Sequence, residues 1–132
     1  MPHISSKKLK KEHLQKLYIE FSDALEKSAK KSWVKFFLND FLTRTEKIMF
    51  AKRFAVIYLL SKDIPVSYIA EALSMSPATI SRMSLKYEIG KYSSLLKATK
   101  SEDKDIWKML EKILRAGLSP RAGRGRWKFL YN

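Results

Sequence analysis

The amino-acid sequence predicts an all-α protein. Apolar residues recur three and four positions apart through most of its 132 residues, which is the spacing of one helix face. One helix start is marked by Thr43 and Glu46, whose side chains are spaced so that each can bind the other's backbone N–H. Helix ends are marked by Pro65, Gly90 and Gly117. The sequence therefore reads as a series of helices separated by short turns.

Three helices are predicted in the first half of the chain. The first follows a basic arm over residues 1–11 and begins near His13, with Leu14, Leu17, Tyr18, Phe21 and Leu25 on one face. The third begins after Thr43 and ends near Ser61. Its apolar residues cover most of its circumference, so we expect this helix to be buried on several sides.

The second predicted helix carries a dense apolar cluster. Its members are Trp33, Phe36, Phe37, Leu38, Phe41 and Leu42. So many aromatic rings in ten residues exceed the share of one helix in the core of a small monomer. They either fill the core of this chain or form a subunit interface, because large exposed apolar patches mark association surfaces. The spacing of the residues alone is compatible with both.

The stretch from Ile69 to Arg82 predicts a helix-turn-helix. Ile69, Ala70 and Leu73 form an apolar stripe on the first helix, and Ile80 of the second helix is placed to pack against it. Ser76 suits the N-cap of the second helix and Pro77 suits its first turn. An ordinary helical hairpin in a core is the alternative.

In a helix-turn-helix the second helix enters the DNA major groove with its N-terminal residues. Thr79 and Ser81 can then hydrogen-bond base edges or phosphates, and Pro77 and Ala78 can touch thymine methyl groups. Polar residues at the start of the first helix would hold the phosphate backbone. The residues expected to contact DNA here are Ser67, Tyr68, Ser76, Pro77, Ala78, Thr79, Ser81, Arg82 and Lys86.

The composition points to a polyanionic partner. The chain has 27 Lys and Arg against 13 Asp and Glu, a formal net charge of +14. Such an excess suits phosphate backbones or anionic membrane surfaces. It has no cysteine, its two histidines lie near the N-terminus, and its longest apolar run, residues 54–60, is too short to span a bilayer. We expect no metal, no membrane segment, and a cytoplasmic, nucleoid-associated location.

The C-terminal part contains one more amphipathic helix and a basic tail. The helix ends near Gly117 and has Ile106, Trp107, Leu110, Ile113 and Leu114 on one face. Residues 12–117 then form one helical domain, and residues 118–132 form a tail rich in glycine, arginine and aromatic residues. Within that tail, Arg124 and Arg126 could enter a minor groove, bind phosphates, or lie beside aromatic residues that dock on the folded body.

On these residues the chain resembles the tryptophan repressor family, from about Lys11 to Leu114. The resemblance is carried by the first helix, the Phe41-Leu42-Thr43 boundary with Glu46, Arg53, the block from Leu73 to Arg82, and the helix with Trp107. It implies a six-helix fold and an intertwined homodimer. It also assigns the aromatic excess to a dimer interface that comprises Leu17, Phe21, Leu25, Trp33, Phe36, Phe37, Phe41, Trp107, Leu110 and Leu114.

The resemblance also indicates where a small ligand would bind. Arg53 and Arg82 match the two arginines that flank the corepressor in the amino-acid-sensing branch of the family, so they mark a possible ligand pocket. Met83 follows the second arginine where that branch has glycine, and its side chain would intrude on the ligand's space. We therefore expect no tryptophan-like corepressor and no cofactor.

The combined prediction is a homodimeric, sequence-specific double-stranded DNA-binding protein, a transcriptional repressor that reads a palindromic operator through residues 66–89. A non-specific DNA-coating or RNA-binding protein that uses its basic tails is the main alternative. An enzyme is not expected, because the acidic residues are scattered over several helix faces and form no paired-carboxylate or nucleophile arrangement.

Overall fold

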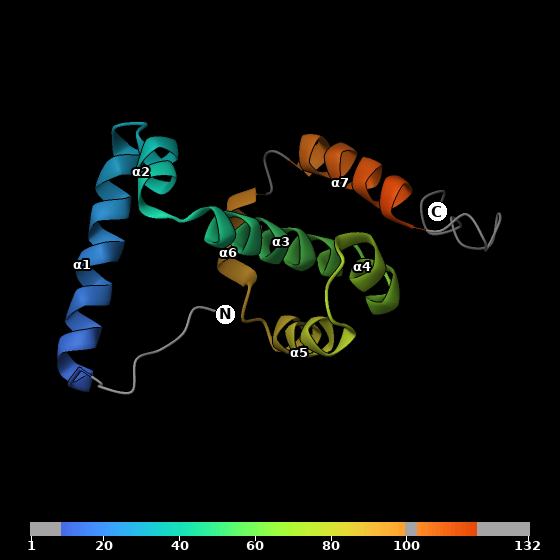
Figure 1. Cartoon of the computed structure of the whole chain (residues 1–132), viewed down its shortest axis with the longest axis horizontal. Helices are drawn as coiled ribbons and strands as arrows, with labels where there is room; N and C mark the ends of the chain where they lie inside the picture. Colours follow the sequence, from blue (N-terminus) through green and yellow to red (C-terminus); the bar gives the residue numbers. More distant parts are fainter. Residues whose placement is uncertain (1–8, 100–102, 119–132) are drawn as a thin grey trace. The chain divides into compact units, whose positions relative to one another are not determined.

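The computed structural model of the chain describes residues 9–99 and 103–118 (Figure 1). Within these ranges the chain is all-α, with seven helices and no strand. Their bounds are α1 Lys11–Lys30, α2 Val34–Phe41, α3 Arg44–Ser61, α4 Val66–Leu73, α5 Pro77–Glu88, α6 Ser93–Thr99 and α7 Asp103–Gly117. The all-α prediction is confirmed.

The expected count of six helices is corrected to seven. The additional helix is α6, in the stretch after Gly90 whose sequence pattern is ambiguous. It forms because Leu95 and Leu96 pack against the core of the chain, and such tertiary contacts can stabilise a segment whose local pattern is weak.

The chain divides into two compact units at the boundary between Lys47 and Ile48, inside α3. The sequence predicts one domain over residues 12–117. The side chains that α3 buries form a run of six, residues 55–60, and all of them belong to the second unit.

The first unit is built on a stack of aromatic rings between α1 and α2. The rings of Phe21 and Phe41 stack with centroids 4.9 Å apart, and Phe37 lies 5.8 Å from Phe41 and 6.1 Å from Phe21. This contact involves only the C-terminal half of α1. Every residue from 11 to 20 is exposed, so no other described residue of the first unit covers the apolar face of the N-terminal half of α1.

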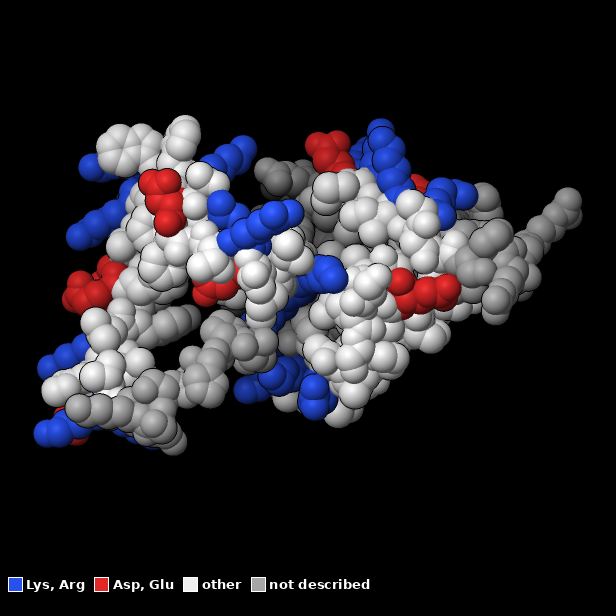
Figure 2. Space-filling model, viewed as in Figure 1, with Lys and Arg blue, Asp and Glu red and all other residues white. Residues whose placement is uncertain are grey.

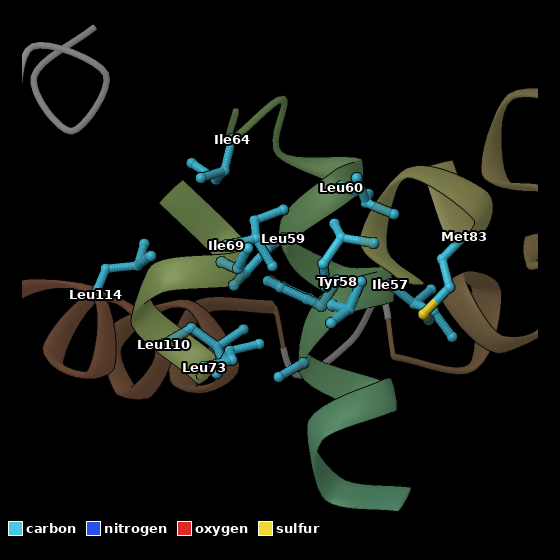
Figure 3. Close-up of a cluster of buried hydrophobic side chains, with 14 of the residues drawn as sticks. Ile57, Tyr58, Leu59, Leu60, Ile64, Ile69, Leu73, Met83, Leu110 and Leu114 are labelled. Atoms are coloured by element: carbon cyan, nitrogen blue, oxygen red, sulfur yellow. The ribbon is translucent and has the colours of Figure 1, made fainter. Parts of the chain in front are cut away.

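The core of the second unit surrounds the C-terminal half of α3. Buried side chains from α4, α5 and α7 join those of Ile57 to Leu60 in one cluster (Figure 3). The N-terminal half of α3 differs from the prediction for this helix, because Ile48 and Phe50 are exposed. Only half of α3 is therefore the central, buried helix that its sequence indicates.

The start of α3 and the end of α7 match the sequence signals. The Thr43 N–H donates to the Glu46 side chain at 2.9 Å, and the Glu46 N–H donates to the Thr43 hydroxyl at 3.1 Å. This is the predicted reciprocal cap. The helix α7 ends at Gly117 as expected, but Leu118, assigned to the tail, is buried in the core.

Candidate nucleic-acid interface

The helices α4 and α5 form the expected helix-turn-helix, with a turn of three residues between them. The Met75 N–H donates to the Ala70 carbonyl at 2.9 Å, and the Ser74 N–H donates to the Glu71 carbonyl at 3.3 Å. Ser74 itself is left-handed, with φ 53° and ψ 53°. This pair of hydrogen bonds around a left-handed residue is a Schellman motif, which ends α4 abruptly and redirects the chain into α5.

The facing sides of α4 and α5 are buried as predicted. Ile69, Ala70 and Leu73 of α4 and Ile80 of α5 all belong to the core cluster. Beyond the predicted set, α5 buries one more side chain, that of Met83. Tyr87 is half-buried against the same core, and the exposed residues of α5 lie on its other sides.

The N-terminal end of α5 presents a polar, accessible surface. The side chains of Ser76, Pro77, Ala78, Ser81, Arg82 and Lys86 are exposed. Thr79 is half-buried, and its hydroxyl accepts a hydrogen bond of 3.4 Å from the Arg82 guanidinium. This contact joins two of the residues that are expected to contact DNA.

The start of α5 differs from the prediction in one respect. Ser76 has the extended backbone of an N-cap and Pro77 is in the first turn, but the Ser76 side chain makes no capping hydrogen bond. The first N–H groups of a helix lack partners within the helix and favour anions. The Ser76 hydroxyl and these N–H groups are therefore suited to a phosphate.

The two predicted backbone contacts at the start of α4 differ in exposure. Ser67 is exposed, whereas Tyr68 is half-buried and packs against the core. Ser67 is thus the more accessible of the two. On the face seen in Figure 2, the surface over α5 is largely uncharged and is bordered by basic side chains.

Comparison with known proteins identifies the family. The sequence profile of the Trp repressor protein family matches residues 16–100, which include α2 to α6 and most of α1. The chain belongs to the Trp repressor family. This is a family of helix-turn-helix DNA-binding transcription regulators and not of enzymes. No curated protein and no solved structure matches the chain.

Arg53 of α3 and Arg82 of α5, which the sequence resemblance marks as a possible ligand pocket, are both exposed. Met83, which follows Arg82, is only 8% exposed and points into the core cluster (Figure 3). Its side chain thus fills space within the protein itself. Among the described residues, no three His, Cys, Asp or Glu side chains gather as metal ligands, and none of the described helices has the length and apolarity to cross a bilayer.

The residues predicted at a dimer interface fall into two groups. Leu17, Trp33, Phe36 and Phe41 of α1 and α2 are exposed, and Phe21, Leu25 and Phe37 are half-buried. The α7 residues differ. Leu110 and Leu114 are 1% and 0% exposed within their own chain, and Trp107 packs against the same core.

Arg124 and Arg126 lie outside the described residues. Other exposed apolar residues were not among the predicted site residues: Leu14, Tyr18 and Ile19 on α1, and Leu85 and Ile89 at the C-terminal end of α5. The pair on α5 is spaced by one helical turn, a signal that is present in the sequence.

Proposed function

We propose that this Trp repressor family member is a sequence-specific, double-stranded DNA-binding transcriptional repressor that uses α5 as its recognition helix. The observation that carries the proposal is that α5 has one buried face and one exposed polar face. Ile80 and Met83 anchor one face in the core, while Ala78, Ser81 and Arg82 are exposed on the others. A rigidly held helix with accessible small, hydroxyl and guanidinium groups suits readout of base edges and phosphates.

We further propose that a second copy of the chain covers the apolar surface of α1 and α2. The face of α1 that carries Leu14, Leu17 and Tyr18 is exposed, and the Phe36 ring of α2 is exposed as well. A 20-residue helix with one apolar face gains its stability from packing of that face. The proposed interface comprises Leu17, Phe21, Leu25, Trp33, Phe36, Phe37 and Phe41.

The interface we propose does not extend to Leu110 and Leu114, because α7 buries them within its own chain. A dimer would present two copies of α5 to half-sites about one helical turn, ~34 Å, apart. The operator would then be a palindrome.

Selection of binding sites from random DNA tests the specificity. The full chain is expected to enrich a palindromic motif, and the Arg82→Ala variant is expected to bind that motif more weakly. Glu88→Ala, at the last residue of α5, serves as a control that removes no proposed DNA contact. Binding without any enriched motif would instead favour a DNA-coating protein, to which the net charge of +14 is also suited.

The dimer is tested separately by the mass of the protein in solution. Phe36→Asp places a charge in the proposed interface on an exposed side chain, so it should convert a dimer to a monomer without loss of helix content. Lys35→Asp, at the neighbouring exposed position of α2, is the matched control. A wild-type chain that is monomeric at micromolar concentration would contradict this part of the proposal.

A further inference from the structure

The first unit holds an open pocket that α1 and α2 line together. Its volume is about 410 Å³, and the residues that line it include Ser28, Trp33, Phe36, Phe37 and Asp40. Its three aromatic residues belong to the surface that we propose for a second copy of the chain. A second copy that covers Trp33 and Phe36 therefore also covers this pocket.

Asp40 is the charged group of this pocket. Successive residues of an α-helix are rotated by about 100°, so Asp40 shares one side of α2 with Phe36 and Phe37. Its side chain is exposed and has no ion-pair or hydrogen-bond partner among the residues that the structure describes. The Ser28 hydroxyl, by contrast, donates to the Leu25 carbonyl at 2.7 Å. A carboxylate that loses its water under an apolar cover is strongly destabilising unless a cation takes the place of the water.

Lys31 is a cation beside the same pocket. Its Nζ lies 5.0 Å from the centre of the Trp33 ring, which is one of the pocket's walls. Lys31 is exposed and has no ion-pair partner in the described part of the chain. Lys35 is also exposed, but the helical rotation places it about 140° from Asp40 around α2, on the far side from the pocket.

These two charges make the surface around Trp33 complementary to a second copy of itself. In a dimer with two-fold symmetry the same patch of both chains meets, so a residue that contacts a second residue across the interface is contacted by it in return. Two chains that each carry a net charge of +14 repel one another. Opposite charges that meet across the interface offset part of this repulsion.

We infer that Asp40 of each chain pairs with Lys31 of the second copy, which closes the pocket and fixes how the two copies meet. The inference rests on the proposed dimer and names the contact that orients it. Lys31 can keep its contact with Trp33 while it donates to the carboxylate, because an ammonium group has three N–H donors. Each dimer would contain two such pairs.

The test combines two charge-reversal variants of the full chain. In a dimer of Asp40→Lys chains each pair brings two cations together, and in a dimer of Lys31→Asp chains each pair brings two carboxylates together. Either variant alone should raise the dimer dissociation constant, measured by sedimentation equilibrium, about 10-fold or more. In an equimolar mixture of the two variants, a mixed dimer again joins opposite charges at both pairs. Its dissociation constant should lie within about 5-fold of the wild-type value.

Asp23→Lys and Lys35→Asp are the matched controls, because they make the same changes of charge. Asp23 is exposed on α1, about 160° around the helix from Phe21, and Lys35 is on the far side of α2 from the pocket. Each control should change the dissociation constant by less than about 3-fold, as expected for an exposed charge outside the interface.

Asp40→Asn removes the charge with little change of shape, so it tests the pair even if a reversed charge disturbs α2. It should raise the dissociation constant about 3- to 10-fold, with the helix content by circular dichroism unchanged. Wild-type dimerisation of Asp40→Asn would overturn the inference, as would a mixture of the two reversal variants that dimerises no better than its components. Both results would leave the proposed dimer standing. A wild-type chain that is monomeric at micromolar concentration would instead remove the dimer, and the inference with it.

Discussion

Gly117 of α7 lies directly against the backbone of Ala72 in α4. A Cβ atom on Gly117 would stand 2.7 Å from the Ala72 carbonyl oxygen and 2.8 Å from the Ala72 Cα, distances that real Cβ atoms do not adopt. The atoms in the way are backbone, so no rotamer change can relieve the contact. The close approach lets the C-terminal end of α7 support the first helix of the helix-turn-helix.

The first prediction concerns this contact. Gly117→Ala should lower the free energy of unfolding by about 2 kcal/mol, because α7 must move away from α4 to admit the methyl group. Urea denaturation followed by circular dichroism measures the change. Gly90→Ala is the control, because a Cβ there meets nothing within 4 Å and only its φ of +82° is strained, at about 1 kcal/mol. An equal or smaller effect at Gly117 would contradict the packing argument.

The second prediction concerns the turn of the helix-turn-helix. Ser74 has a positive φ, which costs a residue with a Cβ about 1–2 kcal/mol and costs glycine little. Ser74→Gly should therefore raise the free energy of unfolding by about 0.5–1 kcal/mol, after the greater entropy of glycine in the unfolded chain is subtracted. The midpoint of urea denaturation reports it. Ser84→Gly, the same change inside α5, should instead destabilise the protein by a few tenths of a kcal/mol or more.

The third prediction concerns the reciprocal cap of α3. Thr43→Ala removes the hydroxyl that accepts the Glu46 N–H and should cost about 1 kcal/mol. Thr45→Ala removes the hydroxyl of the second residue of α3. Its effect on the free energy of unfolding should stay within about 0.5 kcal/mol. Thermal denaturation of the two variants beside the wild type distinguishes them. Equal loss of stability in both would mean that the cap contributes little.

The fourth prediction concerns the attachment of α5. Ile80 and Met83 are the two buried residues of this helix, so Met83→Ala should leave a cavity and cost about 2–4 kcal/mol of unfolding free energy. Leu85→Ala, on the exposed side of the same helix, should change stability by less than about 0.5 kcal/mol. Chemical denaturation gives both values. A small effect at Met83 would show that α5 is held by other contacts.

The fifth prediction follows from the same burial of Met83. Because this side chain fills space beside α5 from within the protein, L-tryptophan should neither bind at micromolar concentration nor strengthen DNA binding. Calorimetry with the full chain, and gel shifts with and without the amino acid, provide the measurements. Micromolar binding of L-tryptophan would show that Met83 moves aside.

Local signals explain which parts of the fold the sequence predicts correctly. The Thr43–Glu46 cap, the break at Pro65, the start of α5 at Pro77 and the stop at Gly117 each depend on residues a few positions apart. The same is true of the packing between α4 and α5, because Ile69 and Ile80 are separated by a single tight turn. The amino-acid sequence is therefore sufficient to locate the helix-turn-helix and the side chains that pack between its two helices.

Burial is different, because it depends on contacts between residues far apart in the chain. The pattern of α3 looks uniformly apolar, and only the tertiary structure decides that residues 55–60 are covered while Ile48 and Phe50 are not. Periodicity likewise places Leu110 and Leu114 on an apolar face without saying that α7 packs this face against α4 of its own chain. The left-handed conformation of Ser74 is also hidden, since serine carries no signal for it as glycine does. The sequence by itself determined the helix-turn-helix and every described helix except α6, and the tertiary structure added α6 and decided which apolar faces are exposed, because both depend on contacts between distant residues.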